Sequence, residues 1–180
     1  ELVRLLPGFR SEFFPARSEW GASLIWEEGV ERLMVSRQPL EAPQAAEDPT
    51  PRQIVRFEAS VRGSLLNIIN VHLSWVKPQN EADGRKLLSF VEPFLGLQTV
   101  IAGDFNVTPD ARTIVALQDA GWTDAWEYLQ GKQGGFTFPA RDPSLRIDYM
   151  FLSPQLLPFA SGLELLEVPG KIKLSDHLGL

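Results

Sequence analysis

The stretch Ile101-Ala102-Gly103-Asp104-Phe105-Asn106 runs from an apolar segment directly into two polar side chains. Residues 100–102 predict a buried strand, and Gly103 permits a tight exit that lifts Asp104 and Asn106 out of the sheet. We expect a helix to open next, with Thr108 as its N-cap and Pro109 in its first position. Polar groups at a strand end above a helix start lie where α/β layers carry their chemistry.

Two interpretations of this stretch remain open. A carboxylate beside a carboxamide can take a proton from a water molecule and orient it, with Phe105 turned inward between the two polar groups. Asp and Asn are also common turn residues, so a plain strand-to-helix turn explains Asp104 and Asn106 equally well.

The composition predicts one domain. A chain of 180 residues with 44% hydrophobic residues supports one sizeable core, so we assign residues 1–180 to a single domain, which we expect to be trimmed at both ends. No apolar run is long enough to cross a bilayer, and no targeting signal is visible. We expect a monomer, and the compartment stays open, with the cytoplasm as the default.

The charge and the absence of cysteine exclude some classes of function. A formal net charge of -6 and a pI near 5.0 argue against a broad basic surface for sequence-independent nucleic-acid binding. With no cysteine, disulfides and thiolate metal sites are excluded.

Apolar periodicity predicts alternating strands and helices. The strongest hairpin signal joins Ile54–Val61 to Leu65–Leu73 through a turn at Gly63, and a second hairpin joins Ala22–Trp26 to Val30–Val35. Residues 41–51 predict a surface loop, and residues 2–6 the tail of a helix. The remaining predictions are helices over Arg85–Leu95, Ala111–Ala120 and, capped by Thr123, Trp122–Tyr128, and strands over Gly134–Pro139, Arg146–Leu152 and Leu163–Val168.

Polar groups gather at several predicted strand ends. Asn70 and His72 share one face of their strand, and Asp148 lies in a strand so apolar that it needs a partner. We predict that this partner is a histidine, and His177 in Ser175-Asp176-His177 is a candidate. An Asp behind an imidazole favours the imidazolium, which is a charged donor for a phosphate oxygen. Each histidine taken alone also has a structural interpretation.

Four motifs, in their order and spacing, resemble the later motifs of the endonuclease/exonuclease/phosphatase superfamily, and the resemblance covers most of residues 20–180. Gly135-Phe136-Thr137-Phe138 and Val35-Ser36-Arg37 are similar to its bacterial members. The four motifs are Asn70-Val71-His72-Leu73, Gly103-Asp104-Phe105-Asn106, Arg146-Ile147-Asp148-Tyr149-Met150-Phe151 and Ser175-Asp176-His177.

The resemblance implies a four-layer α/β sandwich of two mixed, mainly antiparallel sheets with helices on the outside. It also implies a hydrolase of phosphate esters in nucleic acid, lipid or small molecules that depends on Mg²⁺, with Mn²⁺ as the alternative. Phosphoryl transfer needs an aimed water and neutralised charge, which agrees with the residues present.

By matched position, the resemblance implies a role for each residue. Asp104 would orient and deprotonate the attacking water, and Asn106 would help to place it. His177, held by Asp148, would contact the scissile phosphate, and His72 would help to neutralise the charge developing on it.

Three further residues complete the predicted site. The resemblance places Asp176 beside the metal and Asn70 on the phosphate side. Arg146 is a candidate substrate-binding residue in a local basic groove with Arg85 and Arg141, which would offset the net acidity.

One departure from the superfamily concerns the metal. Its principal ligands include a glutamate in a Gln-Glu pair and an asparagine on the first strand, and no residue of this chain occupies those positions. If the chain is the whole protein, we expect poor metal affinity and slow turnover. This departure motivates a second hypothesis, a binding or scaffold module without turnover. A third is a hydrolase that uses an acid/histidine pair without metal.

Overall fold

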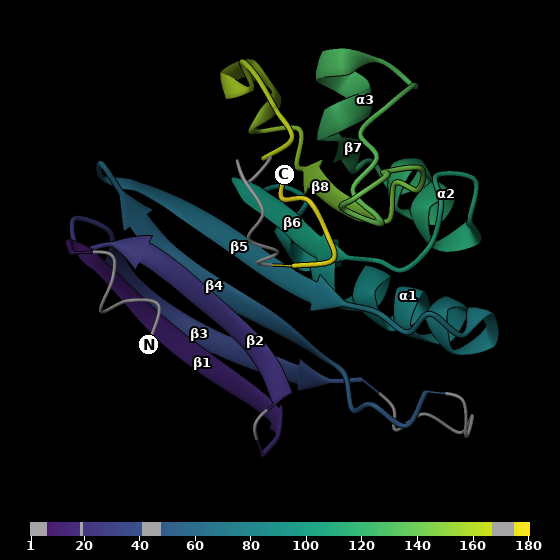
Figure 1. Cartoon of the computed structure of the whole chain (residues 1–180). Coiled ribbons are helices and arrows are strands. Elements are labelled where there is room, and N and C mark those ends of the chain that lie inside the picture. The colour runs from purple at the N-terminus through teal and green to yellow at the C-terminus, as the bar shows by residue number, and fades with distance from the viewer. Residues whose placement is uncertain (1–6, 19, 41–47, 167–174) are drawn as a thin grey trace.

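The computed structural model describes residues 7–18, 20–40, 48–166 and 175–180 (Figure 1). Among these residues, no helix combines the length and the hydrophobicity that crossing a lipid bilayer requires. The helices are α1 (Lys77–Val91), α2 (Arg112–Asp119) and α3 (Ala125–Gln130), with short 3-10 turns η2 (Glu92–Phe94) and η3 (Leu157–Phe159). The strands are β1 (Phe9–Arg17), β2 (Trp20–Glu27), β3 (Glu31–Pro39), β4 (Gln53–Val61), β5 (Ser64–His72), β6 (Thr99–Asp104), β7 (Thr123–Asp124) and β8 (Asp148–Leu152).

The strands form two sheets. The six-stranded sheet has the order β3-β4-β5-β6-β8-β7, in which β5 and β6 run parallel and the other neighbours run antiparallel. The antiparallel pair β1-β2 packs against one face of this sheet, and the helices pack against the other (Figure 1). This arrangement confirms the predicted α/β sandwich of two mainly antiparallel sheets with helices outside. Of the two sheets, the six-stranded one is mixed, and the described residues form three of the four predicted layers.

Alternation along β5 separates the core from the candidate chemistry. Ile69 and Val71 are buried in the main core, which α1 closes with Leu87. Asn70 and His72 lie on the opposite face, because successive residues of a strand point to opposite sides. The polar strand ends therefore lie on the face turned away from the helices.

One predicted hairpin is confirmed and the other is wrong. β4 and β5 pair as expected, and the left-handed backbone at Arg62 (φ 50°) and Gly63 (φ 81°) suits a tight hairpin turn. β2 and β3 both form, but β2 pairs with β1 and β3 pairs with β4. The Trp26 ring packs on the Phe57 ring of β4 with 5.1 Å between centroids, so β2 lies over the large sheet. β1 has no counterpart among the predicted strands, because polar residues and Pro15 obscure its alternation.

The helix boundaries differ from the predicted ones. α1 begins at Lys77 rather than Arg85, because the polar residues Asn80 and Asp83 in its first two turns are buried and hydrogen-bonded instead of forming a loop. α2 begins at Arg112, so the predicted N-cap Thr108 lies in the preceding turn, where its hydroxyl donates to Asp110. The cap of α3 is Asp124 rather than Thr123, since Asp124 accepts from the backbone N–H groups of residues 126 and 127.

Two predicted strands are wrong where the structure describes them. Gly134–Pro139 forms an isolated bridge between Phe138 and Leu145, and residues 163–166 form an isolated bridge between Leu166 and Gly179. Both glycines at 134 and 135 have positive φ, which interrupts an extended strand. The predicted helix tail at residues 2–6, the loop over residues 41–47 and residues 167–168 lie outside the described residues.

Candidate active site at three strand ends

Three neighbouring strands bring polar side chains to one end of the large sheet. His72 at the end of β5 is in register with Asp104 at the end of β6, and Asp104 is in register with Asp148 at the start of β8. The Nε2 atom of His72 lies 3.5 Å from Oδ2 of Asp104. Residues far apart in the sequence thus converge at one site, as the sequence predicts.

Gly103 allows this close approach. Its φ is 143°, and a Cβ at this position would lie 2.0 Å from the carbonyl oxygen of Val71 on the neighbouring strand. Because no other residue lacks a Cβ, a side chain here would push β5 and β6 apart. The backbone N–H of Leu73 also donates to the Asp104 carbonyl at 2.9 Å, which holds the two strand ends together.

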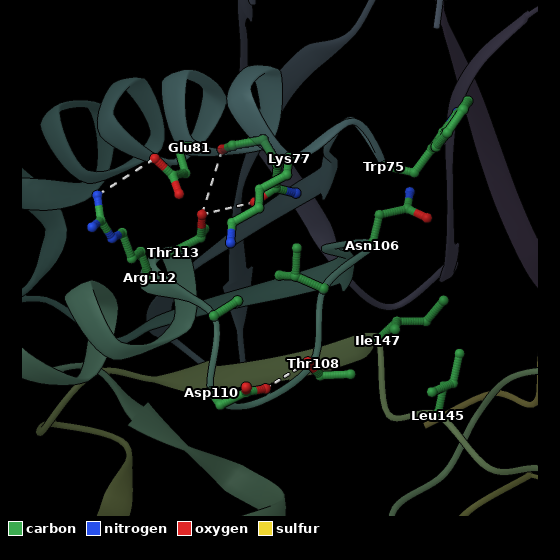
Figure 2. A pocket seen from close by; sticks show the side chains of 13 residues that line it. Trp75, Lys77, Glu81, Asn106, Thr108, Asp110, Arg112, Thr113, Leu145 and Ile147 are labelled. Carbon is green, nitrogen blue, oxygen red and sulfur yellow. Dashed lines mark hydrogen bonds and ion pairs between the residues drawn. The ribbon is translucent and has the colours of Figure 1, made fainter. Parts of the chain in front are cut away.

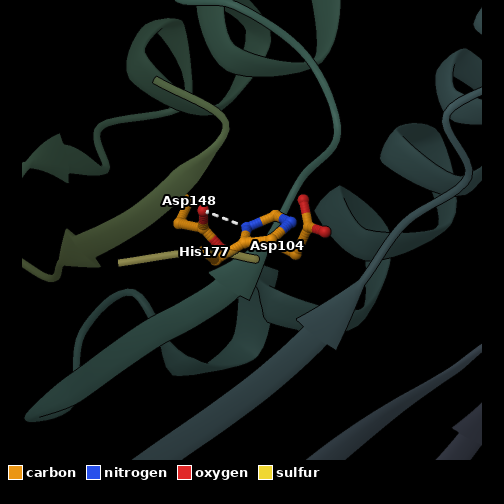
Figure 3. Close-up of side chains that lie close together, drawn as sticks. All are labelled: Asp104, Asp148 and His177. Carbon is orange, nitrogen blue, oxygen red and sulfur yellow. Dashed lines mark hydrogen bonds and ion pairs between the residues drawn. The ribbon is translucent and has the colours of Figure 1, made fainter. Parts of the chain in front are cut away.

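His177 reaches the cluster from the end of the described chain. Its Nδ1 atom lies 2.8 Å from Oδ2 of Asp148 (Figure 3). Its ring packs on Phe138 with 4.9 Å between centroids. The predicted partnership between Asp148 and a histidine is therefore confirmed. One ligand atom from each of Asp104, Asp148 and His177 lies within 4.8 Å of the others.

Asn106 is fixed by its neighbours in an uncommon backbone conformation. Its φ is 55°, in the left-handed region that Asn tolerates better than most residues. Its backbone N–H donates to Asp104 Oδ1 at 2.8 Å, and its Nδ2 donates to the Leu73 carbonyl at 2.9 Å. Phe105 is fully buried against Tyr149, as predicted. With Nδ2 fixed, Oδ1 of Asn106 is the side-chain atom that can accept a hydrogen bond from water.

The electrostatics of the cluster suit a base and an acid at neutral pH. Burial and the nearby charge of Asp148 raise the pKa of Asp104 to about 6. Burial lowers the pKa of His177, but the Asp148 hydrogen bond and the charges of Asp148 and Asp104 outweigh it, so the pKa of His177 is raised. Asp104 is therefore a more basic carboxylate than usual, and the His177 ring stays protonated to a higher pH than a free histidine does.

His72 behaves in the opposite way and should make stability depend on pH. Burial and the positive charges of Arg52 and His177 lower its pKa from 6.5 to about 4. Between these values the unfolded chain binds the proton more readily than the folded chain, so the contribution of His72 to the free energy of unfolding is lost as pH falls from 6.5 to 4. We expect the free energy of unfolding of the wild type, relative to that of His72→Gln, to fall between pH 7 and pH 4.5. Urea unfolding of both proteins at the two pH values measures this change. Because the side chain is 46% exposed, the sign of this change is the test, and pH-independent differences would contradict it.

Asn70 and Asp176 lie near the cluster in different ways. Asn70 lines a cavity of about 240 Å³ together with His72 and Asp104, and its place on the substrate side stays a prediction. Asp176 is exposed, and its backbone carbonyl accepts from the Ala140 N–H at 2.7 Å. Its charge contributes to the raised pKa of His177, while the group of three potential ligands consists of Asp104, Asp148 and His177.

Arg146 lies away from the cluster. Its side chain is 3% exposed, and its Nη1 atom lies 2.7 Å from Oδ2 of Asp124, which is 1% exposed. The guanidinium also packs over the Tyr149 ring, 5.0 Å from its centroid. The structure thus places this predicted substrate-binding residue in a buried ion pair on the helix side of β8.

Asn80 is a supporting residue that was not predicted. It is 1% exposed, and its Nδ2 donates to the carbonyls of Ser74 and Phe105, both at 2.7 Å. Its Oδ1 accepts from the Thr113 hydroxyl at 2.8 Å. Asn80 therefore ties the segment after His72 to the segment after Asp104. Its position seven residues, or two helical turns, before Leu87 is the signal that it lies on the buried face of the helix.

A second unpredicted group lies behind the cavity. Asp48 and Arg52 are buried and paired, with Arg52 Nη2 2.9 Å from Asp48 Oδ2, which also accepts from the Ser74 hydroxyl at 2.7 Å. Burial raises the pKa of Asp48, but hydrogen bonds from Ser74 and Thr50 and the Arg52 charge bring it below its usual value. The same Arg52 charge acts on His72 and Asp104, so this pair contributes to the potential at the site.

The chemistry of these donors fits a hard divalent cation. Asp104 and Asp148 bring two carboxylates close together, and a cation would relieve the repulsion between them. Mg²⁺ is commonly bound through one or two carboxylates together with water and substrate phosphate. Within the described residues, the cluster therefore supplies part of a Mg²⁺ or Mn²⁺ site.

Known proteins resemble this chain in sequence pattern and in fold. A model described as the Endonuclease/Exonuclease/phosphatase family matches residues 33–177. No curated protein matches the chain by sequence.

Several solved structures have a similar fold. The endonuclease/exonuclease/phosphatase from Bacteroides vulgatus aligns with a TM-score of 0.74 and 18% identity, covering 98% of this chain and 76% of that one. The mannosyl-6-phosphatase of Bacteroides thetaiotaomicron aligns with a TM-score of 0.70 and 18% identity, covering 84% of this chain and 65% of that one. The human Nocturnin catalytic domain aligns with a TM-score of 0.62 and 17% identity, covering 85% of this chain and 63% of that one. The chain thus spans slightly less than two thirds of the length of the last two structures, and at these identities the likeness establishes the fold.

Proposed function

This chain belongs to the endonuclease/exonuclease/phosphatase family, and from that membership we propose that it hydrolyses phosphate esters by direct attack of an activated water on phosphorus. The observation that carries the proposal is the convergence of Asp104, Asn106, Asp148 and His177 at the ends of β6 and β8. A base, an orienting amide and a paired imidazole within one cluster are what an in-line attack by water needs.

Each residue has a role that follows from its contacts. Asp104 accepts the proton of the attacking water, since its raised pKa makes it a better base while leaving it ionised at pH 7. Asn106 orients that water through Oδ1, because its Nδ2 is held on the Leu73 carbonyl. His177 keeps its proton because Asp148 pairs with it, and it donates to an oxygen of the scissile phosphate.

His72 and Asn70 act on the phosphate side. With its pKa lowered to about 4, His72 is neutral at pH 7 and donates a hydrogen bond without adding a charge. Asn70 lines the same cavity and supplies an amide donor. We propose that Asp148 and Asp176 supply carboxylates beside Asp104 that would help to hold Mg²⁺ or Mn²⁺, which would neutralise the charge that develops on the phosphate.

The substrate is a phosphate ester, and its wider class is also part of the proposal. The similar structures include a mannosyl-6-phosphatase and TDP2 from Caenorhabditis elegans, the latter with a TM-score of 0.70 and 16% identity over 98% of this chain and 57% of that one. Nucleic acid, lipid and small-molecule phosphates, the classes that the superfamily resemblance implies, are all candidates. A second candidate function is a binding module on the same fold without turnover.

A hydrolysis assay on the full-length gene product tests the proposal. We expect Mg²⁺-dependent release of nitrophenol from p-nitrophenyl phosphate or bis(p-nitrophenyl) phosphate, and a return to the uncatalysed rate when EDTA is added. Readdition of excess Mg²⁺ should restore the activity. Saturable binding of these esters without any product would support the binding module, and release that persists in EDTA would support metal-free acid/histidine catalysis.

A further inference from the structure

A second and larger cavity adjoins the candidate active site. It measures about 540 Å³ and lies between the start of α1, the segment after β6 and the segment before β8 (Figure 2). Asn106 lines it, and the backbone N–H of the same residue donates to Asp104. Asn106 therefore belongs to both the cluster and the cavity, and a group that extends from a phosphate at Asp104 past Asn106 would enter the cavity.

One wall of the cavity is a flat apolar surface. The Trp75 side chain is 55% exposed, in contrast to the buried Trp122, and it lies beside Asn106 at one end of the cavity (Figure 2). Ile147 and Leu145 continue this apolar surface. An exposed indole next to an active site offers a stacking face for a ring. Its apolar surface is large, and the rigid side chain loses little conformational entropy on binding.

The opposite wall carries charges of both signs. Lys77 and Arg112 face Glu81 and Asp110 around the cavity, and the Arg112 Nη1 atom lies 3.8 Å from Glu81 Oε2. The Thr108 hydroxyl bonded to Asp110 lowers the pKa of that carboxyl, so Asp110 is ionised at neutral pH. The wall thus has two cations and two carboxylates and no net charge of its own.

We propose that this cavity binds a sugar ring, and hence that the substrate of the site is a sugar phosphate whose ring stacks on Trp75. The inference rests on the proposed phosphate-ester hydrolysis and adds the class of substrate. A hydroxyl group both donates and accepts hydrogen bonds, so a ring with several hydroxyls matches a wall that alternates carboxylates with ammonium and guanidinium groups. The size is also suitable, since small-molecule sites of about 300–1,000 Å³ enclose ligands of this scale.

A nucleic-acid chain fits this wall less well. The phosphates of the nucleic acid would face the carboxylates of Glu81 and Asp110, and the protein as a whole has a formal net charge of -6. Polynucleotide grooves usually combine stacking aromatics with a strip of uncompensated positive charge. A neutral polar ring avoids this repulsion.

Calorimetric titration of the full-length protein tests the cavity independently of turnover. All proteins carry Asp104→Asn, so that hydrolysis does not consume the ligand, and the probes are glucose 6-phosphate and ethyl phosphate, which lacks a ring. We expect Trp75→Ala to raise the Kd for glucose 6-phosphate about tenfold and to leave the Kd for ethyl phosphate unchanged. Trp75→Phe should recover part of the loss, because a smaller ring still stacks.

The matched control is Tyr128→Ala, an aromatic truncation at a 53% exposed position on α3 outside the cavity, which should bind both probes as the parent does. Equal losses for both probes, or none for either, would overturn the proposal. Tighter binding of adenosine 5′-monophosphate than of glucose 6-phosphate, lost in Trp75→Ala, would assign the cavity to a nucleobase instead. Failure of the hydrolase proposal is a separate result, namely no product from the wild type with Trp75-dependent binding intact.

Discussion

Replacing Asp104 with asparagine is expected to lower kcat for phosphate-ester hydrolysis by about 10²–10⁴-fold, the range in which general-base catalysis contributes. Asparagine keeps the size of the side chain and an oxygen that can accept from the Asn106 N–H, so the backbone of the site should stay in place. It removes the carboxylate whose pKa is raised to about 6 and with it the acceptor for the proton of the attacking water. Steady-state kinetics at saturating Mg²⁺ with bis(p-nitrophenyl) phosphate measures the effect.

Asp119→Asn is the matched control for this substitution. Asp119 is an exposed residue at the end of α2, so its change from carboxylate to amide should leave kcat within twofold of wild type. Circular dichroism should show equal folding for both variants. Wild-type activity in Asp104→Asn would remove the enzymatic assignment, because no other described carboxylate of the cluster is hydrogen-bonded to Asn106.

Replacing Arg146 with methionine is expected to lower the free energy of unfolding by about 3–5 kcal/mol, the usual cost of leaving one charge of a buried pair alone. The lost guanidinium is the partner of Asp124, whose side chain is 1% exposed. Asp124 also caps α3 through its Oδ1, so its position affects both the ion pair and the helix start. Urea unfolding followed by circular dichroism measures the change.

Arg141→Met supplies the control for Arg146→Met. Arg141 is exposed, and its substitution should change the free energy of unfolding by less than about 0.5 kcal/mol. In the double variant Arg146→Met/Asp124→Asn the destabilisation should be smaller than the sum of the single effects, because the buried carboxylate is also neutralised. A stable Arg146→Met protein with a raised KM would instead favour the role in substrate binding that the sequence predicts.

The contrast between Arg146 and Asp148 shows which parts of the site the sequence can predict. Both are charged residues next to an apolar strand, and both need a partner. For Asp148 the chain offers two histidines, and the one in Ser175-Asp176-His177 does pair with it. For Arg146 the chain offers 23 acidic residues, and nothing local identifies Asp124 as the partner. A partner of a rare residue type can therefore be identified from the sequence, because few candidates exist, whereas a partner of a common type cannot.

The strands nearest the site were predictable for a different reason. The alternation of apolar and polar residues over Ile54–Val61 and Leu65–Leu73 indicates which face of each strand is buried. The short turn between the two strands determines that they pair. The polar ends at His72 and Asp104 follow from the same local pattern. Their distance from one another does not, since it depends on the parallel register of β5 with β6 and on the missing Cβ of Gly103.

The superfamily resemblance of four sequence motifs was enough for the two-sheet sandwich, and the amino-acid order was enough for the polar strand ends and the pairing of Asp148 with a histidine. Three features required the folded chain: the pairing of β2 with β1, the buried pair of Arg146 with Asp124, and the cavity at Trp75. The physical reason is common to all three. Periodicity determines which side of an element avoids water, whereas the identity of the neighbour is set by packing between segments that are distant in the sequence.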